Sequence, residues 1–117
     1  MTNTRTNGYQ TIIYPVSDLT KAKAVFGALL GVEPQMDEAY YVGYETAGQH
    51  VGLDPNGHRK GMTGPVTYHH VDDIEAAHAA LVEAGATAHD AISDVGGGRL
   101  VGTVTDGDGN VIGLIQG

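Results

Sequence analysis

The chain has 117 residues and no cysteine, which excludes disulfide bonds, thiolate metal sites and thiol nucleophiles. Its formal net charge of −8 would repel a phosphate backbone, so nucleic acid is not an expected partner. The first ten residues lack the apolar run of a signal peptide, and no window approaches the roughly 18 apolar residues of a membrane span. We therefore expect one cytoplasmic domain with no membrane partner.

The first half of the chain predicts a strand, a helix and three further strands. A strand-like run at 10–16 precedes an amphipathic helix over 17–31. Ser17 or Asp18 can cap the start of this helix, and Gly31 can end it. Further strand-like runs at 32–36, 39–46 and 49–54 are separated by turn formers. The apolar residues at helical spacing are Leu19, Ala22, Phe26 and Leu29.

The second half predicts the same order of elements. A strand at 65–71 precedes a helix over 72–86, and strand-like runs follow at 87–93, 99–105 and 110–116. The helix carries Ile74, Ala77, Leu81 and Ala84 on one face. "VGL" at 51–53 corresponds to "IGL" at 112–114. The pattern predicts an α+β fold of two tandem βαβββ modules, residues 9–54 and 65–116, joined by a linker at 55–64. Because neither half would bury a good core alone, we expect the two halves to share one.

Four stretches connect this doubled unit to a known family: "PVSDLTKAKAVFGALLG", "HVGLDP", "HHVDDIEAAHAALVEAGA" and "DGDGNVIGLI". Together they resemble the vicinal oxygen chelate superfamily, which includes glyoxalase I, the extradiol dioxygenases and the bleomycin resistance proteins. The resemblance covers the chain from about Tyr9 to Gln116. It implies a curved mixed sheet that surrounds a cup-shaped cavity, with both modules forming a single domain over 1–117.

The resemblance also implies where a metal would be bound. Metal-dependent members carry ligands on the inner face of the first and last strand of each module, and these places fall at Thr11, Gly52, Val66 and Gly113. None of these residues is a competent ligand for a catalytic divalent cation. We therefore expect no metal and no other cofactor, and we expect the two glycines to leave room inside the cup.

Several polar and aromatic residues are candidates for lining that cavity. Strand alternation places His50 on the same side as Gly52, and Tyr68 and His70 on the same side as Val66, whereas His69 faces the other way. Alternation puts Tyr40 and Tyr44 on one face and Tyr41 on the other, but it does not decide which face looks inward. The expected ligand-binding residues are Thr11, Tyr40, Tyr44, His50, Met62, Tyr68 and His70.

Three functions are consistent with this pattern. The first is a metal-free protein of the bleomycin-resistance type, associated with antibiotic resistance, which sequesters an aromatic or cationic small molecule in a cavity at a homodimer. The second is a lyase, isomerase or dioxygenase of the same fold, which uses an acid–base histidine or a displaced divalent metal held by His50, His70 and Asp54 or Glu45. The third is an interaction module without a small ligand.

Overall fold

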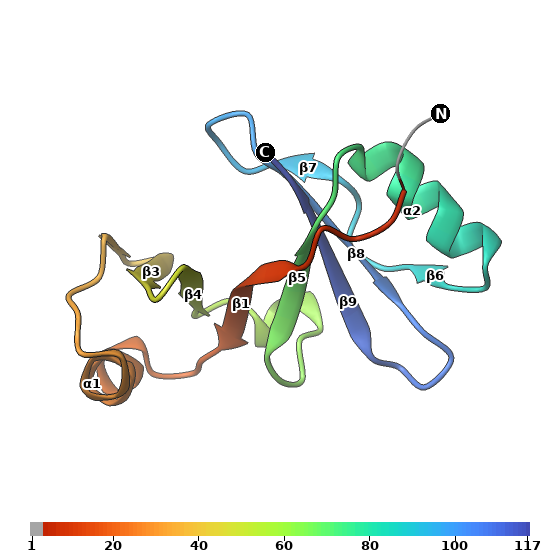
Figure 1. The fold of residues 1–117 in the computed structure, drawn as a ribbon. Coiled ribbons are helices and arrows are strands. Elements are labelled where there is room, and N and C mark those ends of the chain that lie inside the picture. Colours follow the sequence, from red (N-terminus) through yellow and green to blue (C-terminus); the bar gives the residue numbers. More distant parts are fainter. Residues whose placement is uncertain (1–3) are drawn as a thin grey trace. The chain divides into compact units, whose positions relative to one another are not determined.

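A computed structural model describes residues 4–117 of the chain (Figure 1). These residues form nine strands, two α-helices and one short 3₁₀-helix, and the strands pair in both parallel and antiparallel fashion. The expected α+β class is confirmed. Two compact units make up the chain: the first unit is residues 10–66, and the second unit is residues 67–117 with the segment that ends at Tyr9. Within the described range, no helix is long and apolar enough to cross a membrane.

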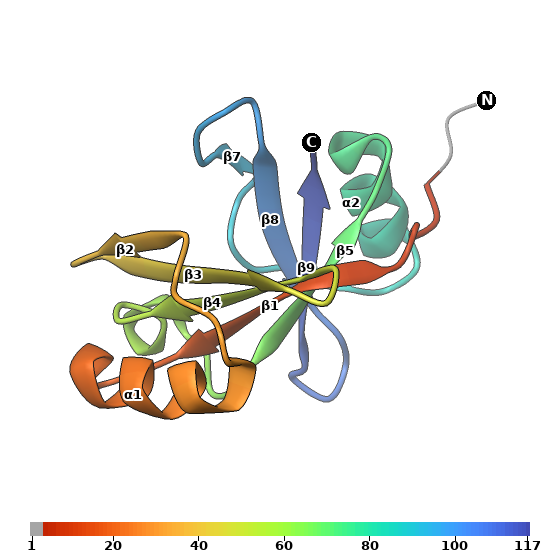
Figure 2. The same cartoon turned by 60° about the vertical axis from the view of Figure 1, so that its left-hand side comes forward.

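The first unit combines a small mixed sheet with helix α1. Its elements are β1 (Tyr9–Pro15), α1 (Leu19–Leu30), β2 (Met36–Glu38), β3 (Tyr41–Thr46), β4 (Gln49–Asp54) and the 3₁₀-helix η1 (His58–Lys60). The strands are ordered β2-β3-β4-β1. Strand β1 runs parallel to β4, and β3 is antiparallel to β2 and β4. In Figure 2, α1 lies along one side of these strands.

Helix α1 begins and ends where its capping residues allow. The Asp18 side chain accepts a hydrogen bond of 3.1 Å from the Lys21 backbone N–H, which satisfies one of the first N–H groups of the helix. Gly31 follows the helix with a φ of 72°, a left-handed conformation that glycine adopts without steric cost. The apolar face of α1 covers a buried cluster on β3 and β4 made of Val42, Tyr44, Val51 and Leu53.

The second unit has its own mixed sheet and helix. Its elements are β5 (Val66–His70), α2 (Ile74–Glu83), β6 (Thr87–Ala88), β7 (Ser93–Asp94), β8 (Leu100–Thr105) and β9 (Val111–Gln116). Strand β5 runs parallel to β9, while β8 is antiparallel to β9, β6 and β7. The α2 residues Ile74 and Ala77 form a buried cluster with Val71 and Leu114.

Three local features differ from the expectations. Leu29 is 73% exposed, and its neighbour Leu30 packs on the core instead. The strand expected at 32–36 is replaced by β2 at Met36–Glu38, after Pro34, which has no N–H to donate to a ladder. The run at 87–93 is divided into β6 and β7, because the Asp90 backbone N–H donates to the Thr103 side-chain oxygen instead of continuing a strand.

Candidate functional site

One side of the first unit's sheet carries two glycines and most of its polar residues. Val42 and Tyr44 on β3, and Val51 and Leu53 on β4, face α1. The alternate residues of each strand therefore face the opposite side. We call this opposite side the glycine face, and it carries Thr11, Tyr41, Gly43, Glu45, His50 and Gly52. In the sheet register Gly43 lies opposite Gly52, Glu45 lies opposite His50, and Thr11 lies beside His50.

The two glycines allow aromatic rings to lie directly on the backbone of the glycine face. A Cβ atom at Gly52 would collide with the Tyr41 hydroxyl oxygen and would lie only 2.6 Å from Cζ of the same ring. A Cβ atom at Gly43 would lie 2.9 Å from Cε1 of His50. The Tyr41 and His50 rings are nearly parallel, with centroids 6.0 Å apart and planes inclined by 8°. Glycine at position 52 therefore leaves no void, because Tyr41 fills the space that we expected to be open.

A short chain of hydrogen bonds runs across the glycine face. The Tyr41 hydroxyl oxygen lies 2.7 Å from Nε2 of His50, and Nδ1 of His50 lies 2.6 Å from Oε1 of Glu45. The His50 side chain is 22% exposed and the Glu45 side chain 47% exposed. A carboxylate, an imidazole and a phenol in sequence can orient one another's protons. This three-residue arrangement, Tyr41–His50–Glu45, is the candidate site, and we refer to it as the triad.

The second unit repeats the contact between an aromatic ring and a strand glycine. Tyr68 lies opposite Gly113 in the pairing of β5 with β9. A Cβ atom at Gly113 would lie 2.6 Å from Cδ2 of Tyr68 and 2.9 Å from the carbonyl oxygen of Thr67. An aromatic side chain that covers a glycine on a neighbouring strand is a known way to compensate for the missing side chain. The expectation of open room therefore fails at Gly113 as well.

The two neighbouring histidines on β5 have different surroundings. His70 is half-buried; burial lowers the pKa of its imidazole below the usual 6.5, and the nearby positive charge of Arg99 lowers it further. His69 lies against the Tyr9 ring, at a centroid distance of 5.3 Å, and its Nδ1 is 3.0 Å from the Thr6 hydroxyl. His69 thus packs against the N-terminal segment.

The other residues expected at the site are distributed over different surroundings. Thr11 is buried and lies on the glycine face beside His50. Tyr44 lies on the opposite side, in the core against α1, where burial raises its pKa and its hydroxyl donates to the Lys23 carbonyl oxygen at 3.4 Å. Tyr40 precedes β3 and is 61% exposed, and Met62 is buried after η1.

Tyr41 was absent from the expected binding residues, and Glu45 was considered there only as an alternative metal ligand. One signal in the sequence points to both. Gly43 and Gly52 are equally far from the turn of a predicted hairpin. A large side chain two residues from a glycine in a strand lies on the same face of the sheet as that glycine. In this hairpin the residues two positions before and after Gly43 are Tyr41 and Glu45.

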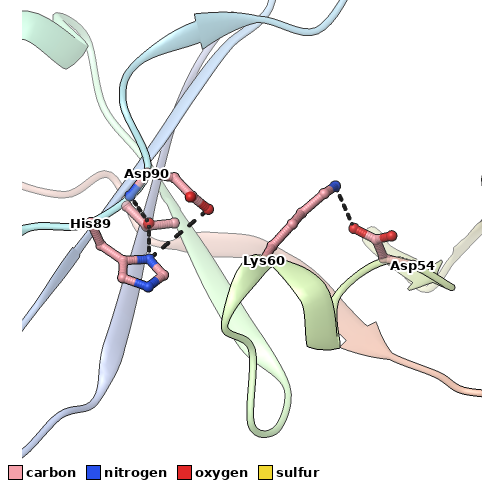
Figure 3. A network of polar contacts seen from close by, with 5 residues as sticks. Asp54, Lys60, His89 and Asp90 are labelled. Atoms are coloured by element: carbon pink, nitrogen blue, oxygen red, sulfur yellow. Dashed lines mark hydrogen bonds and ion pairs between the residues drawn. The ribbon is translucent and has the colours of Figure 1, made fainter.

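Two further polar clusters are drawn in Figure 3, one within each unit. In the first unit, the buried carboxylate of Asp54 at the end of β4 accepts a hydrogen bond of 2.8 Å from Nζ of Lys60. In the second unit, Nδ1 of His89 lies 2.9 Å from the Thr103 hydroxyl and 3.9 Å from the Asp90 carboxylate. Both clusters tie loops to strands.

An open hollow of about 450 Å³ lies on the α1 side of the first unit, between α1 and the strands β2 and β3. Lys23 and Asp37 line it and form an ion pair of 2.8 Å, which raises the pKa of the Lys23 ammonium. Since the sheet lies between this hollow and the glycine face, the hollow is a distinct feature of the surface.

This chain matches the model of a known protein family. Residues 8–114 match the family model described as the glyoxalase/bleomycin resistance protein/dioxygenase superfamily. No curated protein sequence shows significant similarity to the chain.

Solved structures share the fold at low sequence identity. A glyoxalase/bleomycin resistance protein/dioxygenase superfamily member from Vibrio splendidus superposes with a TM-score of 0.71 at 19% identity, over 91% of this chain and 95% of the other. The Mn(II)-bound glyoxalase from Novosphingobium aromaticivorans gives 0.72 at 18% identity, over 96% of this chain but 39% of its own length. Streptomyces coelicolor methylmalonyl-CoA epimerase in complex with 2-nitronate-propionyl-CoA gives 0.69 at 14%, over 96% and 98%.

Proposed function

Since this chain belongs to the glyoxalase/bleomycin resistance protein/dioxygenase superfamily, we propose that it is a metal-independent member that binds a small organic molecule. The observation that carries the proposal is the contact of Tyr41 with Gly52. Where a metal-dependent relative would place a ligating side chain, this protein has a glycine covered by a phenol ring. Tyr68 covers Gly113 in the same way.

The side chains at the four ligand positions do not fit a divalent cation. Gly52 and Gly113 supply no side-chain donor, and Val66 is a buried hydrocarbon. Thr11 alone offers an oxygen, as a neutral hydroxyl. Over residues 4–117, no group of three or more His, Asp or Glu side chains is placed to hold a metal ion elsewhere. No step of the proposed function therefore uses a metal.

The ligand chemistry follows from what the glycine face offers. The nearly parallel Tyr41 and His50 rings are flat surfaces for an aromatic group, and Glu45 places a carboxylate beside them. The net charge of −8 adds a weak preference for cations. We therefore propose an aromatic or cationic ligand.

The wider architecture is part of the same proposal. In each unit a first strand is followed by a helix and runs parallel to the last strand, which supports two βαβββ modules at 9–54 and 65–116. We propose that these modules curve around a cup-shaped cavity and that two chains associate. Sedimentation velocity tests the dimer directly, because a monomer across the micromolar range would contradict it.

Metal analysis and ligand screening together test the proposed function. Protein purified without chelator is examined for Mn, Fe, Ni and Zn, and its melting temperature is measured against a panel of aromatic amines, natural products and antibiotics. A ligand present at 100 times its Kd stabilises the folded state by about 2.7 kcal/mol. Stoichiometric metal, or failure of every compound to raise the melting temperature, would contradict the proposal.

A second candidate function is acid–base catalysis, and the triad is the observation that favours it. A phenol that is hydrogen-bonded to an imidazole, which is in turn hydrogen-bonded to a carboxylate, can transfer a proton to or from a ligand without a metal. Tyr41→Phe keeps the ring over Gly52 and removes the acidic hydroxyl. If the protein converts any ligand found in the screen, the rate constant of the catalytic step falls in this variant while binding of the aromatic group is retained.

A further inference from the structure

The two hydrogen bonds of the triad are donated in the same direction, toward Glu45. This direction determines which hydrogen-bonding group a ligand must bring. Resting on the proposed function, we infer that, with a neutral His50 imidazole, the Tyr41 oxygen acts toward a ligand only as a hydrogen-bond acceptor. The ligand it recognises must then bring a hydrogen-bond donor, and a protonated amine attached to an aromatic ring fits best.

The direction begins at Glu45. An ionised carboxylate only accepts hydrogen bonds, so the contact of 2.6 Å between Oε1 of Glu45 and Nδ1 of His50 requires a proton on Nδ1. A neutral imidazole with its proton on Nδ1 has a lone pair on Nε2 and accepts there. Glu45 therefore selects one of the two tautomers of His50.

The same logic continues to Tyr41. Because Nε2 of His50 accepts, the contact of 2.7 Å must be donated by the Tyr41 hydroxyl. The single proton of the phenol is thereby committed to His50. Every further hydrogen bond that the Tyr41 oxygen makes must then be accepted by it, whichever group is its partner.

The charge of the triad strengthens this preference. The carboxylate of Glu45 polarises the imidazole, and the imidazole in turn draws the phenol proton, which places additional negative charge on the Tyr41 oxygen. A charged donor forms a stronger hydrogen bond to such an oxygen than a neutral one does. Asp54, the carboxylate of β4 on this side, is paired with Lys60, so Glu45 of β3 is the negative charge that acts through the triad.

The surroundings of the triad hold this arrangement in place. Gly43 and Gly52 let the His50 and Tyr41 rings lie flat on the backbone, and Glu45 stands directly opposite His50 in the ladder of β3 with β4. The three side chains come from two adjacent strands, which are rigid elements. The phenol oxygen is therefore held at a defined place on the glycine face.

One substitution reverses the direction while conserving shape. Glu45→Gln replaces the carboxylate by an amide that can donate to Nδ1 of His50. His50 is then free to carry its proton on Nε2 and donate to Tyr41, whose hydroxyl becomes a donor to the ligand. Tyr41→Phe removes the hydroxyl altogether, and Tyr9→Phe removes a hydroxyl in the second unit as the matched control.

The experiment has two readouts at pH 8. Nitrogen-15 NMR reports which ring nitrogen of His50 carries the proton, without any ligand. Backbone amide shifts then report the binding of benzylamine, which presents an ammonium donor, and of acetophenone, which presents only an acceptor. We expect the Nδ1–H tautomer and benzylamine binding at least about tenfold tighter than acetophenone binding, the size of a hydrogen bond to a charged group.

The variants make the outcome specific. The preference for benzylamine should disappear in Tyr41→Phe, fall or reverse in Glu45→Gln together with a change of tautomer, and persist in Tyr9→Phe. The inference is overturned by an Nε2–H tautomer in the wild-type protein, by acetophenone binding as tightly as benzylamine, or by no benzylamine binding. If other compounds of the screening panel bind in any of these cases, the proposed binding function survives and the ligand class is wrong.

Discussion

Replacing Gly52 by alanine is the most direct test of the contact between Tyr41 and Gly52. In most strands this substitution is mildly stabilising, because alanine loses less conformational entropy on folding than glycine, by about 0.5–1 kcal/mol. Here the new methyl group would collide with the Tyr41 hydroxyl and lie 2.6 Å from Cζ and 2.9 Å from Cε1 of the ring. The ring must therefore move.

The cost can be estimated from the contacts that would be lost. Moving Tyr41 breaks its hydrogen bond to His50, worth about 0.5–1.5 kcal/mol. It also removes the contact between the edges of the two rings. We expect Gly52→Ala to lower the free energy of unfolding by about 1–3 kcal/mol, which is the usual range for overpacking.

Urea denaturation of four proteins measures this effect: wild type, Gly52→Ala, Tyr41→Ala and the double variant. In the Tyr41→Ala background the collision is absent, so Gly52→Ala should be neutral or slightly stabilising there, and the coupling between the sites is the difference. Gly27→Ala serves as the control, because a Cβ atom at Gly27 in α1 meets nothing within 4 Å and should stabilise the helix. An equal cost of Gly52→Ala in both backgrounds would refute the assignment of Tyr41 to this space.

Three further predictions follow from the second unit and from the ligand positions. Gly113→Ala should lower the free energy of unfolding more than Gly52→Ala does, and adding Tyr68→Ala should restore only part of the loss. The reason is that the Thr67 carbonyl oxygen, 2.9 Å from the new Cβ atom, belongs to the backbone and cannot rotate away. Urea denaturation measures the stability of the single and the double variant. The pKa of His70, followed by NMR, should lie below 6.5, so the free energy of unfolding should fall as the pH drops below 6.5 and through the pKa of the folded state. Arg99→Gln should raise this pKa without restoring it, since burial is the larger cause, and an unchanged pKa would contradict that charge effect. Dialysis against EDTA should leave the melting temperature unchanged, because the glycines at the ligand positions offer no side chain to a stabilising metal; a lower melting temperature that Mn²⁺ or Zn²⁺ restores would refute this.

The sequence by itself determined the class of fold, both helices and the place of the strand glycines. Helical spacing and capping residues depend on neighbours within a few positions, so Asp18 and Gly31 could be recognised as the ends of α1 without any tertiary information. The resemblance placed Gly52 and Gly113 at family ligand positions for a related reason, since short motifs keep their spacing along the chain.

Only the tertiary structure decided which side of each strand faces the helix and what occupies the space beside the glycines. Alternation put Tyr41 and Tyr44 on opposite faces, but helix α1 packs against the side of Tyr44 and leaves Tyr41 over Gly52. The residues of the triad are neighbours because of the register in which β3 pairs with β4. The alternation of side chains along a strand does not determine which residue of another strand lies opposite. Alternation leaves the two faces of a strand equivalent, and packing of one face against a helix makes them different.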